Sequence, residues 1–139
     1  MHVELVSPER ILYSGDAEMV VCRTVDGGEI AFLAGHAPFL GALGEGLVRI
    51  KTSSGEEVAA VHGGFVEVRD NRVIVLSDVA ELAPDIDVER ARRAKESAER
   101  GGGGGGGGGS AGDEDEAAES EAAVRRADTR LAAADRGGR

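Results

Sequence analysis

The chain has 139 residues, of which 41% are hydrophobic and 30% charged, and its formal net charge is −10 at pH 7. This length fits one domain with an appendage, and the acidic balance argues against nucleic acid or an anionic membrane surface as a partner. The single cysteine, Cys22, excludes an internal disulfide. In the stretch EMVVCRTV we expect it to pack as a small apolar side chain rather than to act as a reactive thiol.

The first residues, MHVELVSPERIL, lack the charged-then-apolar pattern of a secretory leader. No apolar run approaches the roughly 18 residues that a membrane-spanning helix needs. We therefore expect a soluble chain that faces the cytosol.

Residues 1–84 predict an all-β domain. Short runs rich in Val, Ile and Leu recur between turn signals, namely VELVS, AEMVVCRTV, EIAFL, GLVRIK, EVAAVH, FVEVR and RVIVLS. The clearest hairpin is FVEVRDNRVIVLS, where Asp70 and Asn71 tolerate the left-handed backbone of a two-residue turn. Seven to nine short strands at this spacing predict a small β-sandwich or barrel.

Two helices are predicted after Pro84. Residues 85–100 are helix formers with Asp85 or Asp87 as the N-cap. Residues 117–136 form the second helix, with small apolar residues spaced alternately three and four apart. Neither helix would be stable alone in water, so each needs a partner surface.

Residues 101–116, nine glycines followed by SAGDEDE, predict a disordered linker between the helices. A glycine-rich coil of this length spans about 20–25 Å, enough for the second helix to fold back or to reach away. The linker is read either as a joint between a fixed part and a mobile arm or as tolerated filler. The acidic run at 113–116 would attract a divalent cation only weakly, and solvated disorder is the alternative.

Residues that carry chemistry are sparse. His2, His36 and His62 are scattered, there is no metal-ligand spacing, and the glycine-rich stretches lack the phosphate-binding fingerprints. With no nucleophile beside a base, we expect no catalytic residue, no metal site and no required cofactor.

Four motifs occur in an order that resembles the epsilon subunit of F-type ATP synthases: SPE at 7–9, GHAP at 35–38, GGFVEV at 63–68 and IDVERA at 86–91. The similarity covers residues 3–99. It implies an N-terminal antiparallel β-sandwich of about ten strands, followed by a C-terminal two-helix arm.

The resemblance also implies a function. Such a subunit is a non-catalytic part of the central stalk, beside the gamma subunit and on the c-ring. It couples proton flow to ATP synthesis from ADP and phosphate in the alpha and beta subunits. The expected location is peripheral, on the cytoplasmic face of the bacterial plasma membrane. The alternative is a free-standing β-sandwich binding module whose acidic disordered tail recruits a basic partner.

Two sets of site residues follow from the resemblance. The segment 28–40 resembles the ring-facing loop, with Glu29, Phe32 and His36 as c-ring contacts; Phe39 is expected to help bury a patch there. Ordinary core packing of the aromatic rings, and a hydrogen-bonded loop role for His36, are the alternatives.

The stretch IDVERA resembles a motif through which some bacterial epsilon subunits bind regulatory ATP. It implies that Glu81, Asp87 and Arg90, with Arg125 and Arg126 of the second helix, hold the nucleotide. A capped helix with an Asp–Arg pair is the alternative. In the family the arm swings between a folded-back state and an extended state that blocks ATP hydrolysis. The basic residues at 125–139 suit an acidic loop of a beta subunit.

Overall fold

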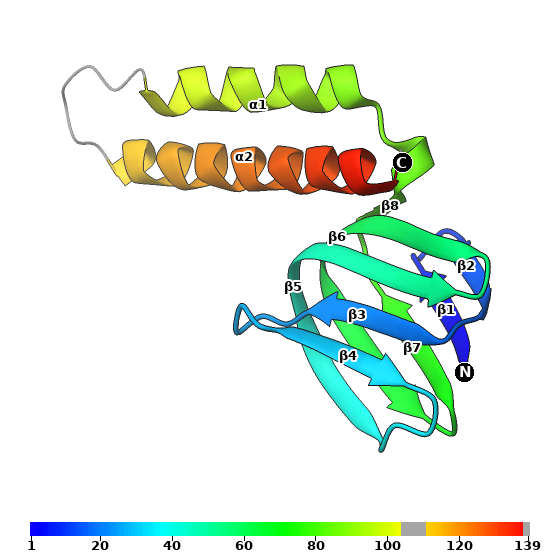
Figure 1. Ribbon diagram of the computed structural model, residues 1–139. Coiled ribbons are helices and arrows are strands. Elements are labelled where there is room, and N and C mark those ends of the chain that lie inside the picture. The colour runs from blue at the N-terminus through cyan, green and yellow to red at the C-terminus, as the bar shows by residue number, and fades with distance from the viewer. Residues whose placement is uncertain (104–110, 138–139) are drawn as a thin grey trace.

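The computed structural model describes residues 1–103 and 111–137, with the side chains of 1–100 and 117–137. An eight-stranded β domain is followed by two antiparallel helices that lie across one end of it (Figure 1). The elements are β1 (His2–Val6), β2 (Ile11–Asp16), β3 (Met19–Arg23), β4 (Glu29–Leu33), β5 (Phe39–Thr52), β6 (Gly55–Arg69), β7 (Arg72–Leu76), β8 (Ala80–Leu82), the short 3₁₀ helix η1 (Ala83–Asp85), α1 (Val88–Gly103) and α2 (Ala111–Gly137).

The two layers of the sandwich are made by one folded sheet, in the order β2-β1-β7-β6-β5-β3-β4. The long strands β5 and β6 form a hairpin that both layers share. In β6, residues 65–69 pair with β7 and residues 59–61 pair with β8. In β5, residues 49–51 pair with β3. The hairpin therefore passes from one layer to the other near its middle.

Glycines permit this passage. Gly63 and Gly64 have backbone φ angles of 90° and 131°, which residues with a side chain rarely adopt. A Cβ on Gly64 would overlap the carbonyl oxygen of Leu76 on the neighbouring strand. The stretches EVAAVH and FVEVR, expected as two strands, are thus a single strand with a glycine bend.

The sandwich core is built from alternating aliphatic side chains, as period-2 strands require. Its fully or almost fully buried members include Val3, Leu5, Val20, Cys22, Phe32, Val66, Val68, Val73 and Val75. The prediction that Cys22 packs as an apolar residue is confirmed. The turn at Asp70 and Asn71 is confirmed too, since both residues have positive φ, 51° and 60°.

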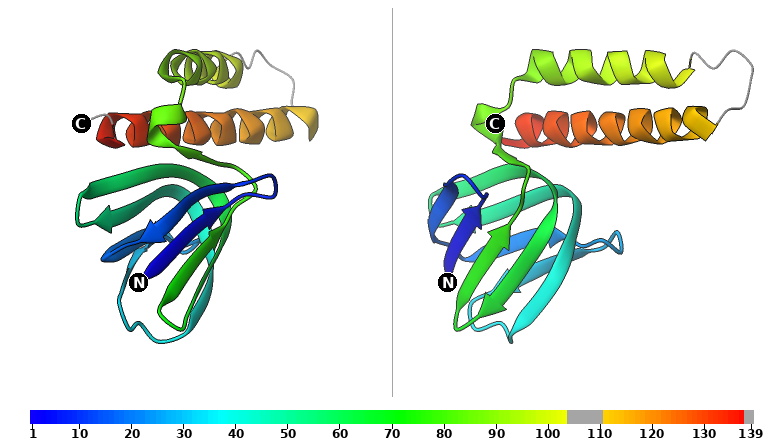
Figure 2. Two further views of the ribbon diagram at one scale, coloured as in Figure 1. Left: turned by 90° about the vertical axis from the view of Figure 1, so that its right-hand side faces the viewer. Right: turned by 180° about the vertical axis from the view of Figure 1, so that it is seen from behind.

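Helix α2 lies between α1 and the sheet (Figures 1 and 2). Both faces of β6 are buried here: Ala59 and Val61 point into the sandwich core, whereas Val58 and Ala60 point toward the arm. The second apolar cluster, between sheet and arm, consists of Val58, Ala60, Ala83, Ile86 and Ala133. The expectation that each helix needs a partner surface therefore fits the packing.

Three expectations need correction. The described residues hold eight strands rather than about ten, because β5 and β6 each run through both layers. The sheet is not wholly antiparallel, since β1 pairs with β7 in parallel. The linker expected over 101–116 is shorter, because α1 continues to Gly103 and α2 begins at Ala111. The acidic residues 113–116 lie in the first part of α2, and acidic residues near a helix N-terminus are favoured by the helix dipole. The linker was interpreted either as a joint for a mobile arm or as tolerated filler. Residues 104–110, which bear on that question, lie outside the described residues.

Candidate functional site

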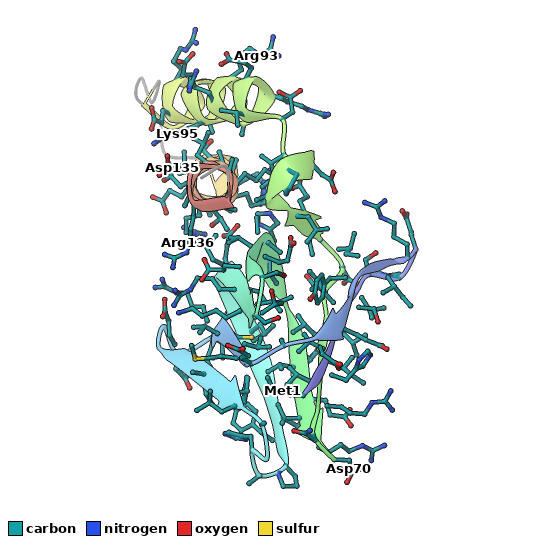
Figure 3. All side chains as sticks on the ribbon, turned by 45° about the vertical axis from the view of Figure 1, so that its right-hand side comes forward. Met1, Asp70, Arg93, Lys95, Asp135 and Arg136 are labelled. Atoms are coloured by element: carbon teal, nitrogen blue, oxygen red, sulfur yellow. The ribbon has the colours of Figure 1, made fainter. Side chains whose placement is uncertain are left out.

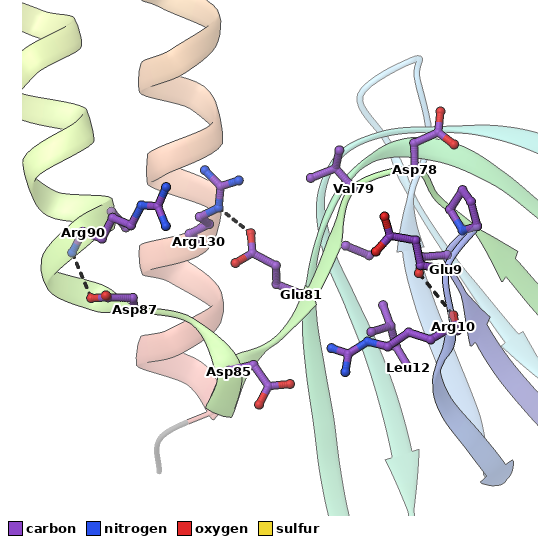
Figure 4. Close-up of a pocket in the computed structure, with 14 residues that line it drawn as sticks. Glu9, Arg10, Leu12, Asp78, Val79, Glu81, Asp85, Asp87, Arg90 and Arg130 are labelled. Carbon is purple, nitrogen blue, oxygen red and sulfur yellow. Dashed lines mark hydrogen bonds and ion pairs between the residues drawn. The ribbon is translucent and has the colours of Figure 1, made fainter.

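A cavity of about 580 Å³ lies where the turn after β1 meets β8, η1 and the two helices (Figure 4). Its wall is strongly charged, with three arginines facing several carboxylates. The lining residues are Ser7, Pro8, Glu9, Arg10, Leu12, Asp78, Val79, Ala80, Glu81, Asp85, Asp87, Arg90, Ala91 and Arg130. We refer to it as the arm-base pocket.

Local structure explains how these side chains reach the arm-base pocket. Asp87 caps helix α1: its Oδ1 accepts a hydrogen bond from the Arg90 backbone N–H at 3.0 Å. That cap fixes the first turn, so Arg90 projects from the start of the helix. On the other wall, Arg130 Nε of α2 donates to Glu81 Oε1 of β8 at 2.5 Å. The pocket thus joins the sandwich to both helices of the arm.

Of the five residues expected to hold a nucleotide, the structure brings together Glu81, Asp87 and Arg90. The two arginines expected from the second helix lie elsewhere. Arg126 pairs with Glu119 at 3.1 Å on its own helix, and Arg125 lines a separate hollow between the helices.

The arginine that α2 contributes to the pocket is Arg130, which the sequence reasoning missed. One feature of the sequence could have indicated Arg130. It lies four residues after Arg126, so the two arginines project from the same face of the helix, one turn apart. Because α2 runs antiparallel to α1, its later residues lie nearer the beginning of α1 (Figure 2).

Two further ion pairs hold the arm. Arg136 Nε of α2 donates to Glu56 Oε1 of β6 at 2.7 Å, and this hydrogen bond lowers the pKa of Glu56. Lys95 Nζ of α1 lies 2.7 Å from Asp128 Oδ1 of α2, and that hydrogen bond raises the pKa of Lys95. Figure 3 shows Lys95 toward α2 and Arg93 on the opposite side of α1.

Within the segment expected to face the c-ring, the loop that follows β4 lies at the end of the sandwich away from the helices (Figure 1). Phe32 is fully buried in the core, so its expected role as a contact is wrong. Its ring packs edge-on against the ring of His36, with centroids 5.0 Å apart. Phe32 therefore stabilises the position of His36 in the loop after β4. His36 is half-buried, and its Nδ1 lies 2.7 Å from the Ala37 carbonyl oxygen. Glu29, at the other end of β4, is exposed and lies 3.6 Å from Arg49 Nη2; it lines a cavity with Asp128 and Arg136 of α2, beside the arm.

Exposed leucines at the end away from the helices were not expected. Leu33 and Leu40 are 56% and 72% exposed. Leu33 follows the buried Phe32 in β4, and alternation along a strand turns it outward. We call the group Leu33, His36 and Leu40 the loop-end patch.

A second exposed apolar surface covers the outer side of β7 and its neighbours. Phe65 and Leu76 stand opposite each other across β6 and β7, and they are 57% and 47% exposed. Val6 of β1 is the next partner of Leu76 in the row. We call Val6, Phe65 and Leu76 the outer apolar row.

Among the described residues, no group of three or more His, Cys, Asp or Glu side chains could hold a metal ion. The side chains at 113–116, the expected weak cation attractor, lie outside that part of the chain. Nor does either helix, over its described residues, combine the length and apolarity needed to cross a bilayer.

Comparison with known proteins identifies the family. The sequence profile of the family described as "ATP synthase, Delta/Epsilon chain, beta-sandwich domain" matches residues 1–83. The ATP synthase epsilon chain of Streptomyces avermitilis is 46% identical over 135 residues, covering 96% of this chain and 94% of its own length. That of Brevibacillus brevis is 52% identical over 101 residues, covering 72% of this chain and 76% of its own length.

Solved structures share the fold. A chain of the Euglena gracilis mitochondrial ATP synthase superposes with a TM-score of 0.77 at 23% identity, covering 94% of this chain and 79% of that one. A chain of the Tetrahymena thermophila enzyme's central stalk and c-ring gives 0.59 at 18% identity, with 94% and 95% covered. The resemblance read from the motifs is confirmed: the chain belongs to the ATP synthase epsilon chain family and is a non-catalytic subunit.

Proposed function

We propose that this chain is the epsilon subunit of a bacterial proton-translocating ATP synthase, in its central stalk, where it couples proton flow through the c-ring to ATP synthesis. The observation that carries the proposal is the match to epsilon chains over 96% of the sequence, together with a fold in which sandwich and arm are both present. The complex places the subunit peripherally, on the cytoplasmic face of the membrane.

The exposed apolar surfaces suggest where the neighbours bind. Large apolar side chains gathered on a surface are typical of protein interfaces. We assign the outer apolar row to the gamma subunit, because a strand face can lie flat against a partner. We assign the loop-end patch to the polar loops of the c-ring; Glu29, expected as a further contact, lies instead beside the arm. Clamped between these partners, the rigid sandwich would transmit torque.

The arm is the regulatory part of the proposal. In the structure it is folded back, held by Arg130–Glu81, by Arg136–Glu56 and by an interface of small side chains. Surface ion pairs contribute little free energy each, about 0–1 kcal/mol, so such docking is reversible. Released, the arm would extend along gamma, and its arginines would meet an acidic loop of a beta subunit and restrain ATP hydrolysis.

The arm-base pocket is the proposed site for regulatory ATP. Arg90 and Arg130 supply guanidinium groups that suit phosphate oxygens. Because the two arginines come from different helices, a nucleotide bound to both would hold the arm folded back. Arg130 takes the place expected for Arg125 and Arg126.

Titration calorimetry of the full chain with ATP tests this site. We expect heat of binding at millimolar ATP or below, lost in Arg90→Gln and in Arg130→Gln. Arg93→Gln, on the opposite side of α1, is the matched control and should bind as the unsubstituted chain does. Absence of heat in the unsubstituted chain would remove the nucleotide proposal.

Removal of residues 101–139 tests the regulatory arm. Membranes carrying the truncated subunit should hydrolyse ATP faster than membranes with the full chain, while proton-driven synthesis is retained. If hydrolysis does not rise, the arm does not restrain it in this complex.

A further inference from the structure

The loop at residues 34–38 joins β4 to β5 within the loop-end patch. Part of what holds it is local, since the His36 N–H donates to the Leu33 carbonyl oxygen at 3.0 Å. In the part of the chain that the structure describes, one hydrogen bond joins this loop to a segment other than β4 and the loop itself. The Gly35 N–H donates it to Asn71 Oδ1, 36 positions later in the sequence, at 3.0 Å.

Asn71 belongs to a well-anchored part of the sandwich. It is the second residue of the two-residue turn between β6 and β7, and Arg69 and Arg72 pair across that turn. Its own carbonyl oxygen accepts a hydrogen bond from the His2 N–H of β1 at 3.1 Å. The backbone of Asn71 is therefore fixed by three strands. Figure 3 shows this turn, labelled at Asp70, at the end of the sandwich away from the helices.

The turn itself does not need the Asn71 side chain. Asp70 and Asn71 have φ of 51° and 60°, in the left-handed region. Glycine adopts this region at least as readily as asparagine, and it is the commoner residue at the second position of such a turn. Because only the amide oxygen can accept from the Gly35 N–H, the hydrogen bond also fixes which way the Asn71 amide points. The side chain thus serves the contact with the loop rather than the hairpin.

The loop that Asn71 holds lies between two exposed apolar side chains. Leu33 and Leu40 are 56% and 72% exposed, and Gly35, the donor, has a positive φ of 79°. Ordering a loop only when a partner arrives costs free energy, whereas a loop that is already in its bound shape avoids that cost. A tether to the sandwich therefore bears directly on how tightly the patch can bind.

We propose that Asn71 is a positioning residue for the loop-end patch: its amide oxygen holds the loop at 34–38 in the shape that the c-ring binds. The polar loops of the ring would then meet a surface that is already ordered. Load on the loop would pass through the hydrogen bond into β1, β6 and β7. The inference rests on the proposed function, since it requires that the loop-end patch binds the c-ring.

The first test follows the Gly35 amide of the full chain by NMR. Asn71→Gly removes the acceptor and keeps the left-handed turn. We expect the Gly35 N–H to exchange with solvent about two- to tenfold faster, the factor that corresponds to one ordinary hydrogen bond. Asp70→Gly is the matched control, because Asp70 shares the turn and its side chain has no hydrogen bond or ion pair within the described residues. It should leave the exchange rate unchanged.

The second test measures binding to the c-ring. The full chain in complex with the gamma subunit is added to purified c-rings in detergent, and its affinity for gamma is measured in parallel. Asn71→Gly should weaken binding to the ring about two- to tenfold. Binding to gamma should not change, because Leu76 of the outer apolar row lies at the opposite end of β7 from Asn71. The double variant Asp70→Asn/Asn71→Asp restores an acceptor oxygen at position 71 at the same net charge, and should bind the ring as the unsubstituted chain does.

Equal exchange of the Gly35 amide in Asn71→Gly, or equal binding of that variant to the ring, would overturn this inference alone. So would a loss of ring binding that Asp70→Gly reproduces or that the double variant does not reverse. If the unsubstituted chain binds gamma but not the c-ring, the assignment of the loop-end patch in the proposed function fails, and the inference fails with it.

Discussion

At the scale of single residues, Gly64 shows how one position permits the fold. Its φ of 131° and the close approach of the Leu76 carbonyl leave no room for a side chain. Gly64→Ala should therefore lower the free energy of unfolding by about 2–4 kcal/mol, from backbone strain and the steric overlap together. Denaturant unfolding measures this.

Gly28→Ala is the matched control for that substitution. Gly28 has no positive φ, and its nearest neighbour to an added Cβ is Thr24 Oγ1 at 3.9 Å. We expect a change within about 0.5 kcal/mol, as for ordinary surface positions. Equal effects at both glycines would contradict the account of the bend.

Cys22 gives a second test at this scale. Burial raises the pKa of its thiol to about 12, and the thiolate is the reactive species. The folded chain should not react with a thiol reagent at pH 8, whereas the chain unfolded in denaturant should react fully. Rapid labelling of the native chain would show that the core around β3 opens readily.

The same scale shows what a sequence can predict of a site. The helix cap, narrowed to Asp85 or Asp87, and the hairpin turn at Asp70 are local features, and the sequence reasoning located both; the structure selects Asp87 as the cap. Arg130 could not be chosen over Arg126, because that choice depends on how far α2 lies along α1. Nor could Phe32 be assigned to the core, since the phase of a strand in the sheet is a tertiary property.

At the scale of elements, the arm is held at its end by Arg136 and Glu56. The Arg136 hydrogen bond lowers the pKa of Glu56, so this contribution to docking is fully present above the ordinary carboxyl pKa. It is lost as the pH falls through the lowered value. The docked fraction of the arm should therefore fall modestly in acid, as Glu56 becomes protonated.

Glu56→Gln isolates that pair. Because the pair is partly exposed, we expect only about a twofold loss of the docked state, and a weaker dependence on salt. Energy transfer between fluorophores on Ser54→Cys, in the turn between β5 and β6, and Glu121→Cys, on α2, measures both. The neighbouring Glu57, for which no ion pair is described, supplies the control Glu57→Gln; an equal effect there would show that net charge, not the pair, matters.

The number of strands, about ten, was predicted incorrectly from the sequence, since the described residues form eight. Period-2 alternation located the strands, but turn signals could not show that β5 and β6 pass through both layers. The parallel pairing of β1 with β7 joins residues about 70 positions apart, and local patterns do not encode such contacts. The two helices were predicted correctly because the composition of the chain changes sharply after Pro84, from strand-forming to helix-forming residues.

At the scale of the whole molecule, the outer apolar row is the proposed surface for gamma. Phe65→Asp and Leu76→Asp should each weaken binding to the gamma subunit by at least about 30-fold, as expected for an interface hot spot. Both side chains are half exposed, so the fold should persist by circular dichroism. Val25→Asp, at a 62% exposed residue of the turn after β3, is the control and should bind normally.

The central claim is that this chain couples proton flow to ATP synthesis without catalysing a reaction itself. The most direct test removes the epsilon subunit from the membranes of the host bacterium, adds back this chain, and measures ATP synthesis driven by a proton gradient. We predict that synthesis returns together with binding of the chain to gamma and the c-ring. Membranes that synthesise ATP equally well without it, or that fail to recover although the chain is bound, would contradict the account.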